Sequence, residues 1–166
     1  MSSTKTCFII MPFGEKVDAA GQHINFDHVY KYIITPPLKK LGLDVVRCDE
    51  IPNPGSIHRD MLSHIRYDDL AIVDITTLNP NVFYELGVRH ALRPSGTILL
   101  RRKGTQSPFN IQGMRTFEYD VDLESAAVAQ TKLTEVIQHA LNNRGTDSLV
   151  HDVFPDLTPA LAIARK

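Results

Sequence analysis

The segment 70–94, LAIVDITTLNPNVFYELGVRHALRP, constrains the fold more than any other part of the chain. It opens with four apolar residues that end at an acid, Asp74, and continues through a polar turn into a pattern of helical spacing. A buried strand, a turn and a helix in this order make half of a βαβ unit, the building block of open α/β sheets. Ligands of such sheets bind at the carboxyl ends of the strands, so the turn after Asp74 is where we first expect a site.

Apolar runs of strand length recur along the chain and alternate with helical patterns. The predicted strands cover 6–11, 43–48, 70–74, 97–100 and 116–119, and the predicted helices cover 26–41, 56–67, 82–93 and 123–141. Crossovers of this length favour a parallel sheet with helices on both faces. We therefore predict an α/β, flavodoxin-like three-layer sandwich with a five-stranded parallel sheet in the order 2-1-3-4-5. Its switch point brings 11–14 and 74–85 to one crevice.

The length of 166 residues suits one domain, predicted at 1–144. The remainder, 145–166, is expected to be a tail that packs on this domain or on a second subunit. The polar segment 14–25 is predicted to be a mobile loop over a strand end, where such loops often gate sites. Pro36 and Pro37 predict a kink or two helical pieces within 26–41, because proline removes an interior backbone hydrogen bond.

Composition argues against several kinds of partner. The net charge of -1 gives no electrostatic basis for binding a nucleic acid polymer or an anionic membrane. No apolar run approaches the ~18 to 20 residues of a membrane span, and no signal peptide is expected. Cys7 and Cys48 each lie in an apolar run and are expected to be free thiols, which favours a reduced, cytoplasmic location.

Several motifs of cofactor and hydrolase sites do not occur in the sequence. It contains neither GxGxxG nor GxxxxGK[ST], so nothing predicts a dinucleotide or a nucleoside triphosphate held in a glycine-rich loop. It also contains no G-x-S-x-G nucleophile elbow. The histidines do not show the spacing of metal ligands. We therefore expect no cofactor and no metal.

Glu85 is the leading candidate for a catalytic residue. It falls in the first turns of the helix that follows the third predicted strand, beside Phe83, Tyr84 and Leu86, an unusually apolar setting for a carboxylate. Gly87 costs roughly 1 kcal/mol relative to alanine inside a helix, so a packing or ligand-approach reason is expected for it. The alternative is an ordinary solvated glutamate, which the helix dipole favours near an N-terminus.

The other polar residues at this crevice each have a structural and a functional interpretation. Asp74 either accepts backbone N–H bonds in the turn or contacts a substrate. Asn79 suits an Asx-turn and Asn81 suits the N-cap of the following helix. Asp60, on the helix 56–67, is either solvated or part of the site. The basic run 101–103 is either a solvated cluster or a phosphate site.

Three short motifs resemble the nucleoside 2-deoxyribosyltransferase superfamily, which includes nucleotide N-glycosidases. They are FIIMPF at 8–13, D-x(7)-D at 60–68 and NPNVFYELG at 79–87. The most specific part is the Phe-x-Glu-Leu-Gly core around Glu85, with Ala91 following it. The resemblance extends over residues 6–120 in the order of the elements, and over the short motifs alone in identity.

The resemblance implies roles for individual residues. Glu85 matches the catalytic glutamate that attacks the anomeric carbon and forms a glycosyl-enzyme ester. Asp60 matches the aspartate that hydrogen-bonds and protonates the leaving base. Asn79 stands where the transferases commonly carry another acid near the sugar, a departure from the pattern of deoxyribosyl transfer. The first loop, which shapes the sugar and base pocket, is matched by Met11, Pro12, Phe13 and Gly14. The candidates for holding a 5′-phosphate are Thr76, Thr77 and Asn81.

The same plan is also similar to Toll/interleukin-receptor-like domains, which cleave NAD at the nicotinamide–ribose bond. Both reactions displace a heteroaromatic group from C1 of a ribose through an oxocarbenium-like transition state, which a carboxylate stabilises. Nicotinamide leaves without a proton, whereas a purine or pyrimidine often needs one. The requirement for Asp60 therefore distinguishes the two substrates.

The expected partners are a small nucleoside, nucleotide or NAD, together with further copies of the chain, because sites in this superfamily are often completed by a neighbouring subunit. Two alternatives are not enzymes. One is a nucleotide-binding or oligomerising module that keeps the fold without catalysis. The other is a receiver-like signalling domain, which needs an acid cluster after the first strand where Met11-Pro12-Phe13 stands instead.

Overall fold

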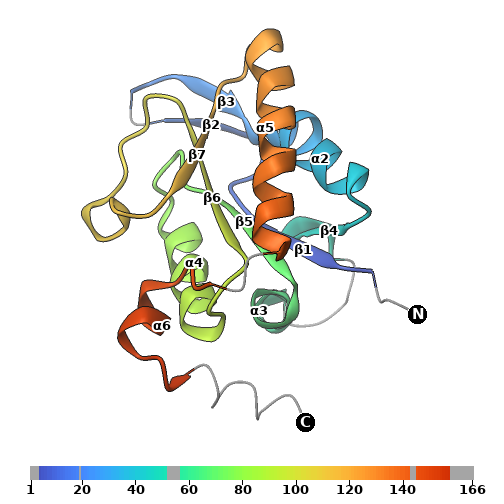
Figure 1. The fold of residues 1–166 in the computed structure, drawn as a ribbon. Helices are drawn as coiled ribbons and strands as arrows, with labels where there is room; N and C mark the ends of the chain where they lie inside the picture. Colours follow the sequence, from blue (N-terminus) through green and yellow to red (C-terminus); the bar gives the residue numbers. More distant parts are fainter. Residues whose placement is uncertain (1–3, 19, 52–56, 143–144, 158–166) are drawn as a thin grey trace.

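A five-stranded parallel sheet forms the centre of the computed structural model, which describes residues 4–18, 20–51, 57–142 and 145–157 (Figure 1). The strand order is β4-β1-β5-β6-β7, and every neighbouring pair is parallel. The strands are β1 Thr6–Ile10, β4 Asp44–Arg47, β5 Leu70–Asp74, β6 Thr97–Arg102 and β7 Thr116–Tyr119. When these five strands alone are numbered in chain order, this is the predicted order 2-1-3-4-5. The flavodoxin-like α/β fold is therefore confirmed.

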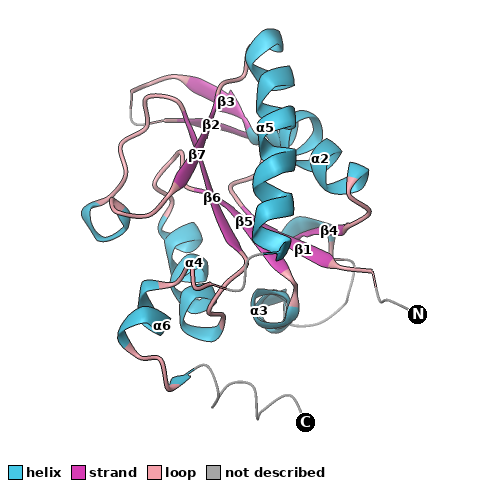
Figure 2. Ribbon diagram, viewed as in Figure 1, coloured by secondary structure: helices cyan, strands magenta, loops and turns pink. Residues whose placement is uncertain are grey.

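Helices cover both faces of the sheet, as Figure 2 shows. Successive strand residues point to opposite faces, so each buried strand serves two cores. Ile9 and Ile72 pack with the helices of one face, α1 Phe26–Val29, α2 Thr35–Lys40 and α5 Leu123–Asn142. Phe8 and Val73 pack with those of the other face, α3 Ile57–Tyr67 and α4 Pro80–Leu92. None of the described helices is long and apolar enough to cross a membrane.

The segment after β1 differs from its prediction, because part of the expected loop forms an antiparallel hairpin. Its strands are β2, Glu15–Val17, and β3, His23–Asn25. Three-residue strands are too short to produce a clear alternating pattern, and β2 is exposed throughout. Ile24 anchors the hairpin, because its side chain is buried in the core beneath α1 and α5.

The helical region 26–40 is divided into pieces, as the proline pair predicts. The change in geometry lies before the prolines, in a π-helical segment at Tyr30–Ile34. Pro36 and Pro37 then fall in the first turn of α2, where a missing backbone N–H costs no intrahelical hydrogen bond. Ser56, at the start of the predicted helix 56–67, lies outside the described residues.

The described part of the tail, 145–157, lies on the domain, where α6, Leu149–Val153, is beside α4 (Figure 1). The carboxylate of Asp147 accepts hydrogen bonds from the backbone N–H groups of Gly96 (2.7 Å) and Thr97 (3.0 Å). The Ser148 hydroxyl donates to the carbonyl of His90 at 2.7 Å. These contacts supply partners for the last turn of α4 and for the start of β6.

Replacement of Asp147 by alanine is expected to lower the free energy of unfolding by about 1–3 kcal/mol, because two backbone N–H groups at the start of β6 lose their acceptor. Urea denaturation followed by circular dichroism measures this loss. Asp156→Ala removes an exposed carboxylate from the same tail and serves as the control. Equal stability of the two variants would show that the Asp147 contacts are not required.

A buried arginine joins α4 to the amino ends of the strands. Arg89 is 0% exposed, and its guanidinium donates hydrogen bonds to the carbonyls of Ile65 (2.7 Å), Asp68 (3.0 Å), Asp69 (3.4 Å) and Gly96 (2.9 Å). Gly96 has φ of +87°, and a Cβ there would lie 2.4 Å from the Asp69 carbonyl oxygen. Only glycine fits this crossing without a shift of the backbone.

Candidate functional site

The turn between β5 and α4 places the candidate residues at the carboxyl end of the sheet. Asn79 is the N-cap of α4, and its side-chain oxygen accepts the backbone N–H of Asn81 at 2.9 Å. The interpretation of Asn81 as the cap is therefore wrong: Pro80 takes the first helical position, so the cap must precede it. Leu78, just before the cap, has φ of 51°, a strained value for a residue with a side chain.

Glu85 lies one turn into α4 and is half-buried. Burial raises the pKa of its carboxyl from 4.5 to about 7. No described residue forms a hydrogen bond or an ion pair with it, so nothing in the described structure offsets the cost of desolvating its charge. A side chain Cβ added at Gly87 would meet nothing within 4 Å, so packing within the described chain does not explain this glycine. Glu85 can thus gain or lose a proton close to neutral pH.

Asp60 and Glu85 come from different helices, α3 and α4, and the negative charges of both influence the pKa of one thiol. Burial raises the pKa of Cys48, and the negative charges of Glu85, Asp49 and Asp60 raise it further. Cys48 follows β4 directly and packs against the core beneath α3 and α4, as Phe83 does. The sequence predicted Cys48 as a buried thiol, and nothing in the pattern indicated its place beside the site.

The first loop is held by an arginine that the sequence analysis did not single out. The guanidinium of Arg47 lies between two aromatic rings, 5.0 Å from the centroid of Phe13 and 4.4 Å from that of Tyr30. Its Nε and Nη2 donate to Asp49 at 2.6 and 2.7 Å, and its Nη1 donates to Asp27 at 2.8 Å. Such stacking on aromatic faces is favourable for a desolvated arginine.

This arrangement determines which residues of the first loop reach the surface. Phe13 remains 38% exposed although its ring stacks with Arg47. Met11 and Pro12 are buried, and Gly14 is half-buried. Of the four predicted residues of this loop, Phe13 is therefore the one whose side chain is most available to a ligand.

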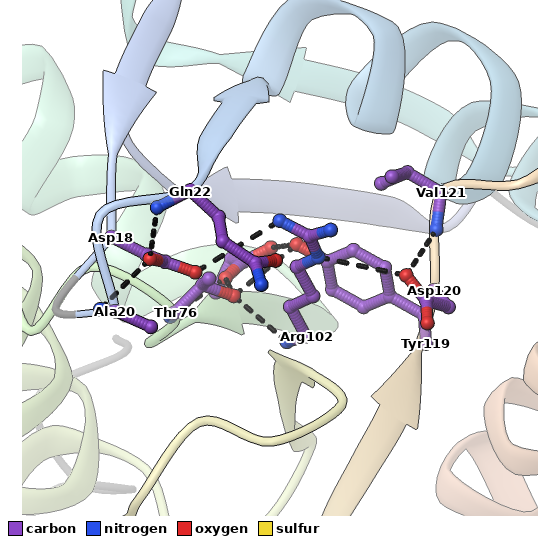
Figure 3. A network of polar contacts seen from close by, with 9 residues as sticks. Asp18, Ala20, Gln22, Thr76, Arg102, Tyr119, Asp120 and Val121 are labelled. Atoms are coloured by element: carbon purple, nitrogen blue, oxygen red, sulfur yellow. Dashed lines mark hydrogen bonds and ion pairs between the residues drawn. The ribbon is translucent and has the colours of Figure 1, made fainter.

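Asp74 and Thr76 lie below the surface, each 1% exposed. Figure 3 shows Thr76 and Tyr119 in the polar network at this end of the sheet. One oxygen of Asp74 accepts hydrogen bonds from the backbone N–H (2.9 Å) and hydroxyl (2.6 Å) of Thr76, and the other accepts from the hydroxyl of Tyr119 at 2.6 Å. Burial raises the pKa of Asp74, while these donors oppose the rise. The two residues join the ends of β5 and β7, which is the structural interpretation of Asp74, and neither presents its side chain to a ligand.

Both arginines of the basic run 101–103, which lie at the end of β6, are paired with acids. Arg101 forms an ion pair with Glu118 at 2.7 Å. Arg102 lies 3.9 Å from Asp18 of the hairpin and 3.5 Å from Asp120 after β7 (Figure 3). These carboxylates compete with a phosphate for both arginines, so the described contacts favour a structural role: Arg102 ties the β2–β3 hairpin to the sheet.

Tyr119→Phe is expected to lower the free energy of unfolding by about 1–3 kcal/mol, because the buried Asp74 loses a donor. The raised pKa of Asp74 already makes its ionisation unfavourable to folding, so stability falls as pH rises through the folded pKa. Without the Tyr119 hydroxyl this fall becomes larger. Chemical denaturation at pH 4 and pH 8 tests the difference, and Tyr67→Phe, at an exposed ring, is the control. An equal loss at both pH values would contradict the assigned hydrogen bond.

The described residues do not form a metal site, since no group of three or more His, Cys, Asp or Glu side chains converges on one point. A surface hollow of about 760 Å³ lies beside β4, and neither Glu85 nor Asp60 lines it. We take as the candidate site Glu85 and Asp60, on the helices that follow β5 and β4, and Phe13, in the loop that follows β1. Segments that follow the carboxyl ends of parallel strands carry the ligand sites of such sheets.

Comparison with known proteins does not place the chain in a family. No model of a known protein family matches it, and no curated protein matches it at a significant level. The roles of the site residues are therefore argued from the motifs and the geometry.

Proposed function

We propose that the protein cleaves or transfers at the N-glycosidic bond of a nucleoside or nucleotide, with Glu85 as the nucleophile. The observation that carries the proposal is a half-buried carboxylate, unpaired within the described structure, on the helix that follows β5. Burial raises its pKa to about 7. An ion pair would lower the pKa of a carboxyl group, whereas catalytic carboxyl groups often have raised values. The NPNVFYELG motif at 79–87 supports the same role.

The proposed reaction has two displacements at C1 of the sugar. The ionised carboxylate of Glu85 attacks C1, the C1–N bond breaks, and the base leaves with the bonding electrons. Asp60 supplies the proton that a purine or pyrimidine requires and is left ionised. Water, or the nitrogen of a second base, then attacks C1 of the glycosyl ester, frees Glu85 and returns a proton to Asp60.

A chromatographic product assay tests the proposal. The full chain is incubated with ribonucleosides, deoxyribonucleosides, their 5′-monophosphates and NAD, beside the Glu85→Gln variant. Release of a free base by the wild type, absent in the variant, is the expected result. Release by both proteins would remove Glu85 from the reaction. Tight binding of a nucleotide without product would instead indicate the non-catalytic module.

Replacement of Asp60 by asparagine separates the substrate classes. For a nucleoside with a neutral base, we expect kcat to fall about 10²–10⁴-fold, since general acid catalysis is lost. For 7-methylguanosine, whose cationic base leaves as a neutral molecule, the expected change is small. If NAD is the substrate, the variant keeps its activity for the same reason. An equal loss on all three substrates would show that Asp60 acts on the fold or on binding instead.

A further inference from the structure

The turn between β5 and α4 contains a leucine in a backbone conformation that leucine rarely adopts. Leu78 has φ of 51°, and among the described residues it is the one residue other than glycine with a positive φ. In this region the Cβ of an ordinary residue crowds the following carbonyl oxygen, so glycine, and less often asparagine or aspartate, takes such positions. The other described positions with positive φ are all glycines: Gly14, Gly21, Gly42, Gly96 and Gly104. At position 78 the chain therefore carries leucine where it otherwise carries glycine.

Packing in the hydrophobic cores does not account for this leucine. Leu78 belongs to neither of the two described cores, and 39% of the residue is exposed. Its backbone N–H donates to the carbonyl of Ile75 at 3.1 Å, a bond that any residue except proline can make. The structural alternative is a hydrophobic staple, in which the residue before an N-cap packs on the fourth residue of the helix, here Phe83. A staple would make the Leu78 side chain a source of stability, which a substitution can measure.

Leu78 lies at the same edge of the sheet as the candidate site. β1 and β5 are neighbouring parallel strands, with Ile10 paired to Val73, so the segments that follow them start side by side. Phe13 follows β1 and Leu78 follows β5, and the two residues are 38% and 39% exposed. Leu78 also directly precedes the N-cap of α4, the helix that carries Glu85. Two exposed apolar side chains therefore follow adjacent strands at the end of the sheet where this helix begins.

The strained conformation of Leu78 points to a ligand, because strained residues persist where they serve binding or chemistry and cluster at such sites. An apolar side chain suits the flat face of a base, whereas sugar hydroxyls or a phosphate would lose hydrogen bonds to water against it. We propose that Leu78 is a specificity-determining residue whose side chain contacts the base of the nucleoside, in a backbone conformation that asparagine or glycine would adopt at a lower cost. This inference rests on the proposed function and names the part of the substrate that the turn after β5 recognises.

Two substitutions at position 78 separate the conformational cost from the side-chain contact. Leu78→Asn removes the apolar contact and relieves the strain, whereas Leu78→Ala removes the contact and keeps the strain. In thermal denaturation without ligand, we expect Leu78→Asn to melt at or above the temperature of the wild type and above that of Leu78→Ala. If Leu78→Asn melted below the wild type, the leucine would stabilise the start of α4 as a staple, and the proposal would be overturned.

Isothermal titration calorimetry with adenosine, guanosine, cytidine and uridine measures the contact itself. The titrations use the full chain with Glu85→Gln, which should bind a nucleoside without cleaving it. For the nucleoside that binds most tightly, adding Leu78→Asn or Leu78→Ala should weaken binding about tenfold or more, because apolar contact area is lost. Adding Leu78→Met, which keeps an apolar side chain of similar volume, should leave binding nearly unchanged. Leu149→Asn, at an exposed leucine of α6, is the control and should not affect binding.

Unchanged binding in the Leu78→Ala chain would overturn the proposal, and so would a chain that binds none of the four nucleosides. The product assay on the wild type tests the proposed function separately, because it involves no change at position 78. Release of a base that depends on Glu85, together with unchanged affinity in the Leu78→Ala chain, would leave the proposed function intact and remove this role of Leu78.

Discussion

The Glu85→Gln variant is expected to lose turnover by a factor on the order of 10³ or more while it remains folded, because an amide of the same shape cannot form the glycosyl ester. The measurement is initial-rate release of free base from the substrate that the product assay identifies. In the wild type, the rate should rise as pH increases through about 7, the pKa to which burial raises Glu85, because only the ionised carboxylate attacks.

The stability of the same variant should move in the opposite direction. The folded pKa of Glu85, about 7, lies above its ordinary value of 4.5, so the folded state binds more protons than the unfolded state between these values. The free energy of unfolding of the wild type therefore falls as pH rises through this range, and glutamine lacks this loss. After a reduction for partial exposure, we expect Glu85→Gln to be more stable by on the order of 1 kcal/mol at pH 8 and equal at pH 4.

The control for both measurements is Glu135→Gln, at an exposed position of α5. It should keep both the activity and the stability of the wild type at either pH. A Glu85→Gln variant that loses activity and stability together would show that the carboxylate supports the fold. A catalytic carboxylate that is buried without a partner lowers the free energy of unfolding, so its replacement should raise that free energy while activity is lost.

The sheet was predictable because its strands are buried on both faces. Runs such as 6–11 and 70–74 contain no polar alternation, and each is separated from the next by a helix-length segment, which leaves few topologies. The hairpin at 15–25 was not predictable in the same way, since Ile24 alone is anchored in the core and its neighbours are exposed. Pro80 at the first helical position indicates Asn79 as the N-cap, so the local sequence already contradicts the interpretation of Asn81 as the cap.

The position of the candidate site remains a prediction from local sequence, and the contacts that surround its residues could not be predicted in the same way. The carboxyl edge of β5 and the apolar setting of Glu85 follow from local sequence. The place of Arg47 beside the first loop depends on contacts between segments that are far apart in the chain, such as those of Arg47 with Asp27 and Phe13. Asp74 shows the reverse case: an acid at a strand end has two interpretations, and its partner Tyr119, 45 residues away, decides between them.

Arg89 is the clearest example of a residue whose role depends on distant contacts. The helical pattern of α4 gives no reason for an arginine on the buried side. The structure shows that this side faces the end of α3 and the starts of β5 and β6, where carbonyls lack donors from within their own elements. Burial lowers the pKa of Arg89 to about 10, so the side chain remains charged at neutral pH and its hydrogen bonds are charge-assisted.

Arg89→Met is therefore expected to reduce the free energy of unfolding by about 3–5 kcal/mol, a large part of the stability of a domain of this size. Methionine fills much of the same volume but donates no hydrogen bond, so the carbonyls of Ile65 and Asp68 stay buried without this donor. Denaturation in urea measures the loss, with exposed Arg59→Met as the control. Arg89→Lys keeps the charge but cannot span both pairs of carbonyls, and an intermediate loss is expected. If Arg89→Met instead matched the wild type, hydrophobic packing of α4 alone would hold the amino edge together, and the guanidinium would have to be explained by specificity of the fold rather than by its stability.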